Sequence, residues 1–164
     1  IVYSWGVLHH TGAMHLALDN AAVPVRIGGK LFISIYNDQG IWSRLWTWEK
    51  RTYNRAPRML RPLVALPFVC GQELNMVRAY VCGRNPLGYF RYWSQYADVS
   101  ARGMNRWHDI IDWVGGYPYE FATPDQIFDF YRERGFTLTK LKCGGVGLGC
   151  NEFVFVKSPH KTSV

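Results

Sequence analysis

Short apolar runs alternate with a helical pattern along the first 36 residues of the chain. Residues 1–7 (IVYSWGV) are apolar on both faces of an extended chain, which is typical of an interior strand in a parallel sheet. After a turn at 9–12, the apolar spacing over 14–23 predicts a helix, and a double glycine at 28–29 precedes a second, β-branched strand at 31–36. Strand, helix and strand make a βαβ unit with an expected right-handed crossover.

The middle of the chain, residues 38–116, predicts a helical insertion rich in Trp, Tyr and Arg. Helical patterns cover residues 40–53, 72–81 and 89–113. Three prolines are expected to divide the chain after the first of these helices into short pieces, at Pro57, Pro62 and Pro67.

The last third of the chain predicts a helix followed by a hairpin. Thr123 is a good N-cap and Pro124 suits the first helical position. Residues 136–142 and 151–157 alternate as strands do, and their short connection makes them an antiparallel pair. Residues 158–164 are expected to form a flexible tail. The whole pattern predicts a single α/β domain.

Composition supports a globular protein, with 48% hydrophobic and 19% charged residues. Apolar stretches stay shorter than a membrane span. The cysteines form no C-x-x-C pair, which favours reduced, mostly buried thiols in a cytoplasmic protein over a zinc site or a disulfide framework. They are Cys70, Cys82, Cys143 and Cys150.

The net charge of +7 is concentrated in one stretch, residues 44–61, which holds six basic residues against Glu49. This favours an anionic partner such as nucleic acid, a phosphorylated substrate or a membrane surface, although a solvated helix face explains it equally well. The same stretch could bind lipid headgroups or nucleic acid by stacking. We favour a substrate lid with Trp42 and Trp46 in its core.

A glycine loop at 145–149 spells G-x-G-x-G. Such a loop cradles a nucleotide when a helix follows, because the helix N-terminus then faces the phosphates. Here a strand follows, so we expect only a flexible hairpin connection.

Three quoted segments together resemble the second half of a class I S-adenosylmethionine-dependent methyltransferase. They are VLHHTG after the first strand, GGKLFISIYN at the second, and DWVGGYPYEFATP before the last helix. The last segment resembles small-molecule methyltransferases described as ubiquinone-biosynthesis-like. The resemblance implies a truncated Rossmann-like sheet with strands equivalent to 4-5-7-6, the last pair an antiparallel hairpin, and a helical insertion.

The resemblance also implies methyl transfer from S-adenosylmethionine to a small-molecule acceptor. The family's Gly-rich cofactor loop would precede Ile1, so we expect this chain to be the carboxyl-terminal portion of such an enzyme, incomplete or inactive alone. Ser4, Trp5 and Gly6 would lie near the cofactor, Gly6 because the backbone can approach closely there.

His9 and His10 are the candidate catalytic residues, because they follow the carboxyl end of a parallel strand. Either could be a general base near neutral pH, or could fix the loop by a hydrogen bond. A metal site is not expected, since adjacent residues of an extended chain point in opposite directions. Candidate substrate-binding residues are Tyr36, Asn37, Trp42, Asp112, Trp113, Tyr117 and Glu120.

Some candidates also have structural explanations. Asn37 could cap the following helix. Asp109 and Asp112 share a helix face, where paired carboxylates could bind a cation or serve acid-base chemistry. We favour a structural role, in which they pair with Arg102 and Arg106.

The rival hypothesis is a non-catalytic binding module that reuses the fold. Without neighbouring strands, residues 1–7 would form an apolar sheet edge, and we expect a second copy to cover it in a homodimer. A basic nucleic-acid binder rests on charge alone.

Overall fold

The computed structural model describes residues 1–83, 85–99, 103–145 and 149–159. The chain divides into two compact units. The sheet unit comprises residues 1–47 and 118–164, and the helical unit comprises residues 48–117. The helical unit overlaps nearly all of the range 38–116 that the sequence marks as an insertion, but begins ten residues later and ends one residue later. Part of the glycine loop and most of the predicted tail lie outside the described residues.

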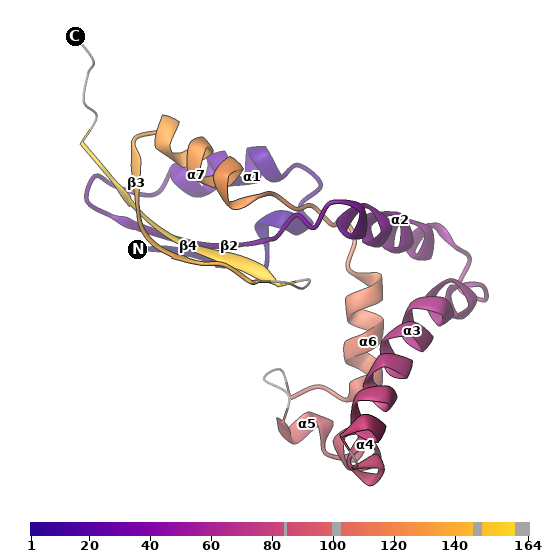
Figure 1. The fold of residues 1–164 in the computed structure, drawn as a ribbon. Coiled ribbons are helices and arrows are strands. Elements are labelled where there is room, and N and C mark those ends of the chain that lie inside the picture. The colour runs from indigo at the N-terminus through magenta and orange to yellow at the C-terminus, as the bar shows by residue number, and fades with distance from the viewer. Residues whose placement is uncertain (84, 100–102, 146–148, 160–164) are drawn as a thin grey trace. The chain divides into compact units, whose positions relative to one another are not determined.

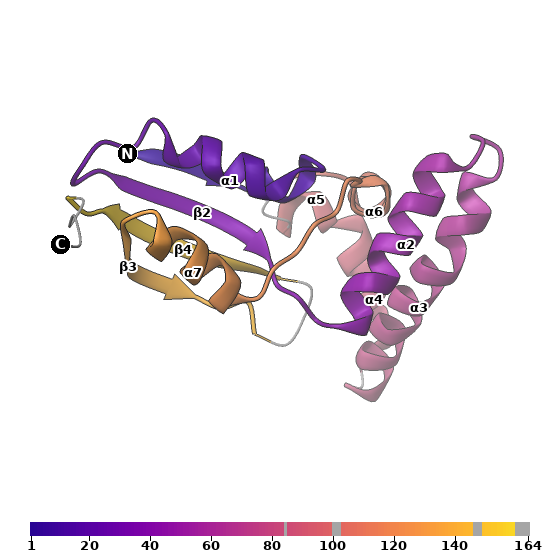
Figure 2. The same cartoon turned by 90° about the horizontal axis from the view of Figure 1, so that it is seen from above.

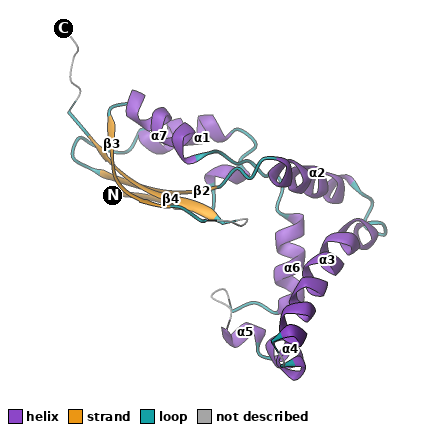
Figure 3. Cartoon of the chain, in the orientation of Figure 1, coloured by secondary structure: helices purple, strands orange, loops and turns teal. Residues whose placement is uncertain are grey.

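A four-stranded mixed sheet forms the centre of the sheet unit (Figures 1 and 3). Its order is β1-β2-β4-β3, in which β1 and β2 are parallel and β4 is antiparallel to both β2 and β3. The strands are β1 (Val2–Trp5), β2 (Lys30–Tyr36), β3 (Phe136–Lys142) and β4 (Cys150–Lys157). The predicted α/β class and the antiparallel pairing of the last two strands are confirmed.

Strand β1 is shorter than the predicted 1–7. Gly6 has a φ of +73°, in the left-handed region, and this turns the chain out of the sheet directly after Trp5. In the described part of the chain β1 pairs only with β2, so it lies at an edge of the sheet.

Helices α1 (Met14–Ala22) and α7 (Pro124–Glu133) cover one face of the sheet (Figure 2). Apolar side chains alternate on β2 and β4, which directs every second one toward these helices. The Tyr131 hydroxyl donates to the Leu18 carbonyl at 3.0 Å and so joins the two helices. The fully buried centre of this core contains Leu18, Leu31, Ile33, Ile35, Ile127, Tyr131, Phe153 and Phe155.

The helical unit begins within α2 (Ile41–Arg55) and continues with four further described helices. These are α3 (Arg61–Cys82), α4 (Pro86–Ser94), α5 (Tyr96–Val99) and α6 (Arg106–Gly115). The prediction that prolines divide this region is wrong for Pro67, which lies inside α3. Pro62, by contrast, lies in the first turn of α3, where the missing N–H costs nothing.

The prediction of one helix over 89–113 is also wrong. The Asn105 side chain accepts from the Trp107 N–H at 2.8 Å and starts α6 as a separate helix. Glu73 of α3 joins the helices, accepting from Arg106 at 2.7 Å and from Tyr89 at 2.9 Å.

Two surface properties differ from expectation. Cys70, Cys82 and Cys143 are exposed and Cys150 is half-buried, so the prediction of mostly buried thiols is wrong, although all four are free. Trp42 is 62% exposed, so the prediction that it lies in the core of a lid is wrong, whereas Trp46 is half-buried. No helix in the described ranges has both the length and the apolar character that crossing a membrane requires.

Candidate functional site

The candidate site lies in the sheet unit, at the carboxyl ends of the parallel strands β1 and β2. A 3₁₀ turn, η1 (Leu8–His10), follows β1 and carries both histidines, while Tyr36 is the last residue of β2. The His9 and Tyr36 ring centroids are 4.1 Å apart, and those of His10 and Tyr36 are 5.5 Å apart. Ligands of open α/β sheets bind at this edge, so the structure brings together three predicted site residues where binding is favoured.

His9 is fully buried, with 0% of its surface exposed. Neither ring nitrogen makes a hydrogen bond of normal geometry with a described residue, although the Ser34 backbone lies near enough to favour the charged form. Burial, assisted by the neighbouring His10, lowers the pKa of His9 to about 4. His9 is therefore neutral at pH 7 and packs as an aromatic ring.

His10 is half-buried and its ring is oriented by the backbone. Its Nδ1 lies 2.6 Å from the Pro118 carbonyl oxygen. Because a carbonyl only accepts, Nδ1 carries the proton, and in the neutral ring Nε2 keeps its lone pair. This is the tautomer that a general base needs, fixed by a contact from a distant part of the chain.

Residues 118–122 lie against the ends of β1 and β2. Of these residues, the sequence predicted only Glu120 as part of the site. The Glu120 N–H donates to the His9 carbonyl at 2.9 Å, and the Ala122 N–H donates to the Tyr36 carbonyl at 3.0 Å. Tyr119 was not among the predicted site residues, yet it is buried and its ring centroid is 4.9 Å from that of Tyr36. The aromatic repetition in GYPYEF was the available signal.

The Glu120 carboxylate has a structural contact in this structure. Its Oε1 accepts from the backbone N–H of Met14 at 3.1 Å, at the start of α1. A carboxylate there is favoured by the positive end of the helix dipole. Its Oε2 is buried without a hydrogen-bond partner among the described residues.

The three predicted cofactor-binding residues lie at the end of β1. Ser4 is half-buried in the strand, and the Trp5 indole donates to Glu152 at 3.3 Å. Among the described residues, no atom lies within 4 Å of the position that a Cβ would take at Gly6. The backbone at Gly6 can therefore be approached closely by a ligand.

The remaining predicted substrate residues do not all gather at this site. The Asn37 Oδ1 accepts from the Asn151 amide at 2.9 Å, and Asp38 instead bonds the Gly40 N–H at the start of α2. Asn37 therefore holds β4 rather than capping the helix.

Asp112, Trp113 and Tyr117 belong to the helical unit, where the Lys50 ammonium lies 4.1 Å from the Trp113 ring centroid and donates to the Trp113 carbonyl. The structure shows other contacts for two residues of the expected Asp–Arg pairs. Arg106 donates to Glu73, and Asp109 accepts from the Tyr96 hydroxyl. Arg102 lies outside the described residues.

The chain matches no protein-family model, no curated protein and no solved structure.

Proposed function

We propose that the chain carries the acceptor side of an S-adenosylmethionine-dependent methyltransferase, together with part of its donor site at Ser4, Trp5 and Gly6. The observation that carries the proposal is the strand order β1-β2-β4-β3 with β4 reversed. The resemblance implies this order: strands 4, 5, 7 and 6 of the family correspond to β1, β2, β4 and β3, and strand 7 is the antiparallel one. The site at the carboxyl ends of β1 and β2 supports the proposal, because it holds the residues that the resemblance assigns to chemistry.

The donor, when bound, supplies a methyl group on a positively charged sulfur. Gly6 fits such a ligand, because the space beside its backbone is open. The protein's own contribution is to position the acceptor and to remove its proton. His10 fits the second task, since its Nε2 lone pair is kept available by the Pro118 contact at Nδ1. His9, fully buried and neutral, supports the ring of Tyr36 instead.

Calorimetric titration with S-adenosylmethionine, repeated with S-adenosylhomocysteine, tests the proposal. We expect saturable binding at one site. Gly6→Val should weaken it at least about tenfold, because the side chain occupies the open space at the strand end. Gly28→Val is the matched control: Gly28 has a φ of +74° and equally open surroundings, but it precedes the opposite end of β2. No heat from either ligand at millimolar concentration, or equal weakening by both substitutions, would contradict the proposal.

His10→Asn separates the proposed base from a structural role. The asparagine amide can still donate toward the Pro118 carbonyl, but it has no basic nitrogen. Once an acceptor is identified, we expect kcat to fall about 10²–10⁴-fold with unchanged cofactor binding. Unchanged kcat would assign His10 to positioning alone.

A second candidate function, a homodimeric binding module, is favoured by the edge strand β1. Tyr3 and Trp5 of β1 are 68% and 51% exposed, and in the described part of the chain the outer edge of β1 is open to another strand. Two copies paired through β1 would bury these side chains. Tyr3→Lys should then halve the molar mass measured by light scattering, whereas a monodisperse wild-type monomer would contradict this candidate.

A further inference from the structure

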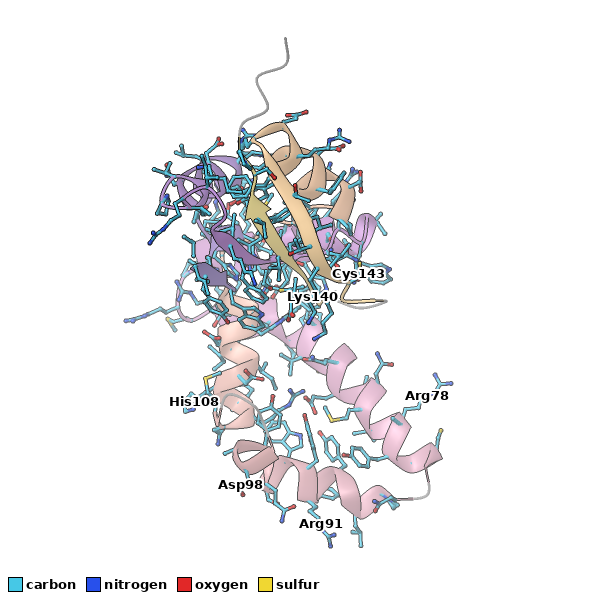
Figure 4. All side chains as sticks on the ribbon, turned by 90° about the vertical axis from the view of Figure 1, so that its left-hand side faces the viewer. Arg78, Arg91, Asp98, His108, Lys140 and Cys143 are labelled. Carbon is cyan, nitrogen blue, oxygen red and sulfur yellow. The ribbon has the colours of Figure 1, made fainter. Side chains whose placement is uncertain are left out.

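The helical unit contains a cavity of about 260 Å³ between the end of α2, the first half of α3 and α6. Its apolar walls are Pro62, Ala65, Leu66 and Val69 of α3 and Trp107, Ile110, Ile111 and Val114 of α6. Each set has the spacing of one helix face, so both helices turn an apolar face toward the cavity. In Figure 4, His108 of α6 and Arg78 of α3 point outward, away from the space between the two helices.

The cavity takes the place of a filled core. The buried apolar residues in the described part of this unit include Ile110 and Val114, and both line the cavity. Leu66 and Trp107 line it too, and each is 53% exposed. An apolar cavity that stays empty lowers stability in proportion to its volume, and one of about 150 Å³ already binds benzene. Apolar side chains that surround a larger space therefore indicate a site for an apolar group.

The cavity also has a positively charged part. Arg58 and Arg61 line it, and none of the described residues that line it is acidic. The Arg61 Nε donates to the Ala56 carbonyl at 3.2 Å, and one of its terminal nitrogens donates to the Asn54 carbonyl at 3.4 Å. Its Cζ lies 5.6 Å from the ring centroid of Tyr53, which is also a lining residue. These partners are neutral, so they orient the guanidinium without cancelling its charge.

Arg58 provides a second cation beside the first. It lies three residues before Arg61, and its side chain is exposed. In the described part of the chain, Arg58 has no hydrogen-bond or ion-pair partner. Guanidinium groups pair with carboxylates and phosphates in a bidentate geometry. Two arginines beside an apolar cavity therefore match a molecule that has an apolar body and an anionic head group.

We propose that this cavity binds an amphiphile with a single alkyl chain and one anionic head group, a carboxylate or a phosphate. The chain lies between α3 and α6, and the head group binds Arg58 and Arg61. At roughly 30 Å³ per small group, the share of a water molecule in the liquid, the cavity holds on the order of ten such groups. This suits one chain of medium length and excludes the paired chains of a membrane lipid. The site lies within the helical unit and does not depend on methyl transfer.

Calorimetric titration of the full chain with octanoate, octyl phosphate and 1-octanol tests recognition of the head group. We expect saturable binding of at least one of the two anions at one site, and binding of the neutral alcohol at least about tenfold weaker. The anion that binds more tightly identifies the head group. No binding of either anion up to millimolar concentration, or equal binding of 1-octanol, would overturn the proposal.

Two arginine variants test the role of the charge. Arg58→Gln should weaken binding of the anion about tenfold and leave binding of 1-octanol unchanged, because it removes a charge-assisted hydrogen bond to the head group. Arg55→Gln is the matched control, since it removes the same charge three residues earlier, outside the cavity, and should keep the wild-type affinity. Equal weakening by the two substitutions would overturn the assignment of Arg58.

Filling the cavity tests the place of the alkyl chain. Ala65→Phe puts a ring into the space and should weaken binding of the anion at least about tenfold, because the ring and the alkyl chain compete for one volume. Ala79→Phe adds the same ring at an exposed position of α3 outside the cavity and should keep the wild-type affinity. Circular dichroism should show both variants folded. A folded Ala65→Phe variant with the wild-type affinity would overturn the proposal, and the Arg58→Gln titration decides it if Ala65→Phe does not fold.

Discussion

The burial of His9 links the candidate site to stability. Folding lowers the pKa of His9 from 6.5 to about 4, mainly by desolvation, so the folded state binds fewer protons than the unfolded state between these values. The free energy of unfolding should therefore fall by about 3 kcal/mol as the pH drops from 6.5 to 4. His9→Phe should remove this dependence in urea titrations at several pH values. His15→Phe, at an exposed position, should keep it; equal slopes in both variants would contradict the assignment.

Glu49 in α2 should act with the opposite sign. It is fully buried, neither carboxylate oxygen has a hydrogen-bond partner among the described residues, and desolvation raises its pKa from 4.5 to about 7. The folded state binds more protons in this window, so stability falls as the pH rises from 4.5 to 7.

Glu49→Gln should therefore stabilise the protein by about 1–3 kcal/mol at pH 8 and leave it unchanged at pH 4. Chemical denaturation at the two pH values measures the difference. Glu133→Gln, at an exposed carboxyl of α7, should have no such effect, and a destabilised Glu49→Gln variant at pH 8 would contradict the prediction.

The two histidines show how far residue-level prediction reaches. Their place at the end of a parallel strand follows from the apolar run before them, and the structure confirms it. The sequence does not predict their different surroundings: the 3₁₀ turn buries His9 and leaves His10 half-buried. The contact that fixes the His10 ring comes from Pro118, 108 residues away, and no local sequence pattern predicts it.

At the scale of elements, strong local signals gave correct predictions. The Thr123-Pro124 start of α7 is confirmed, and the Gln126 side chain accepts from the Thr123 N–H at 3.0 Å, as a capping box requires. The alternating strands β3 and β4 also form as expected.

The prediction that Pro67 ends a helix is wrong, because α3 continues through it. A proline inside a helix removes one hydrogen bond and crowds one carbonyl, but a long helix with packed neighbours continues past it. Glu73, which binds three residues of α4 and α6, is such a tertiary hold on α3. The local sequence does not predict this tertiary contact, and so it did not predict that the helix continues past Pro67.

Pro67→Ala tests this account of α3. The alanine N–H restores a donor one turn after Leu63, so the substitution should stabilise the helical unit by about 1–3 kcal/mol. Thermal unfolding followed by circular dichroism measures the gain. Pro57→Ala, outside α3, should give a much smaller change, and a destabilised Pro67→Ala variant would show that α3 needs the proline.

At the scale of the whole chain, the two units differ in how much apolar surface they bury. The sheet unit has a core of thirteen buried residues, whereas the buried apolar residues in the described part of the helical unit are Tyr96, Ile110 and Val114. Local stability follows buried apolar contacts, so the helical unit should open at a lower free energy than the sheet.

Hydrogen exchange measured by mass spectrometry should therefore find the slowest amides in β2 and β4, with those of α3 exchanging well before them. Equal protection of α3 and β2 would contradict the prediction and show that the two units open together.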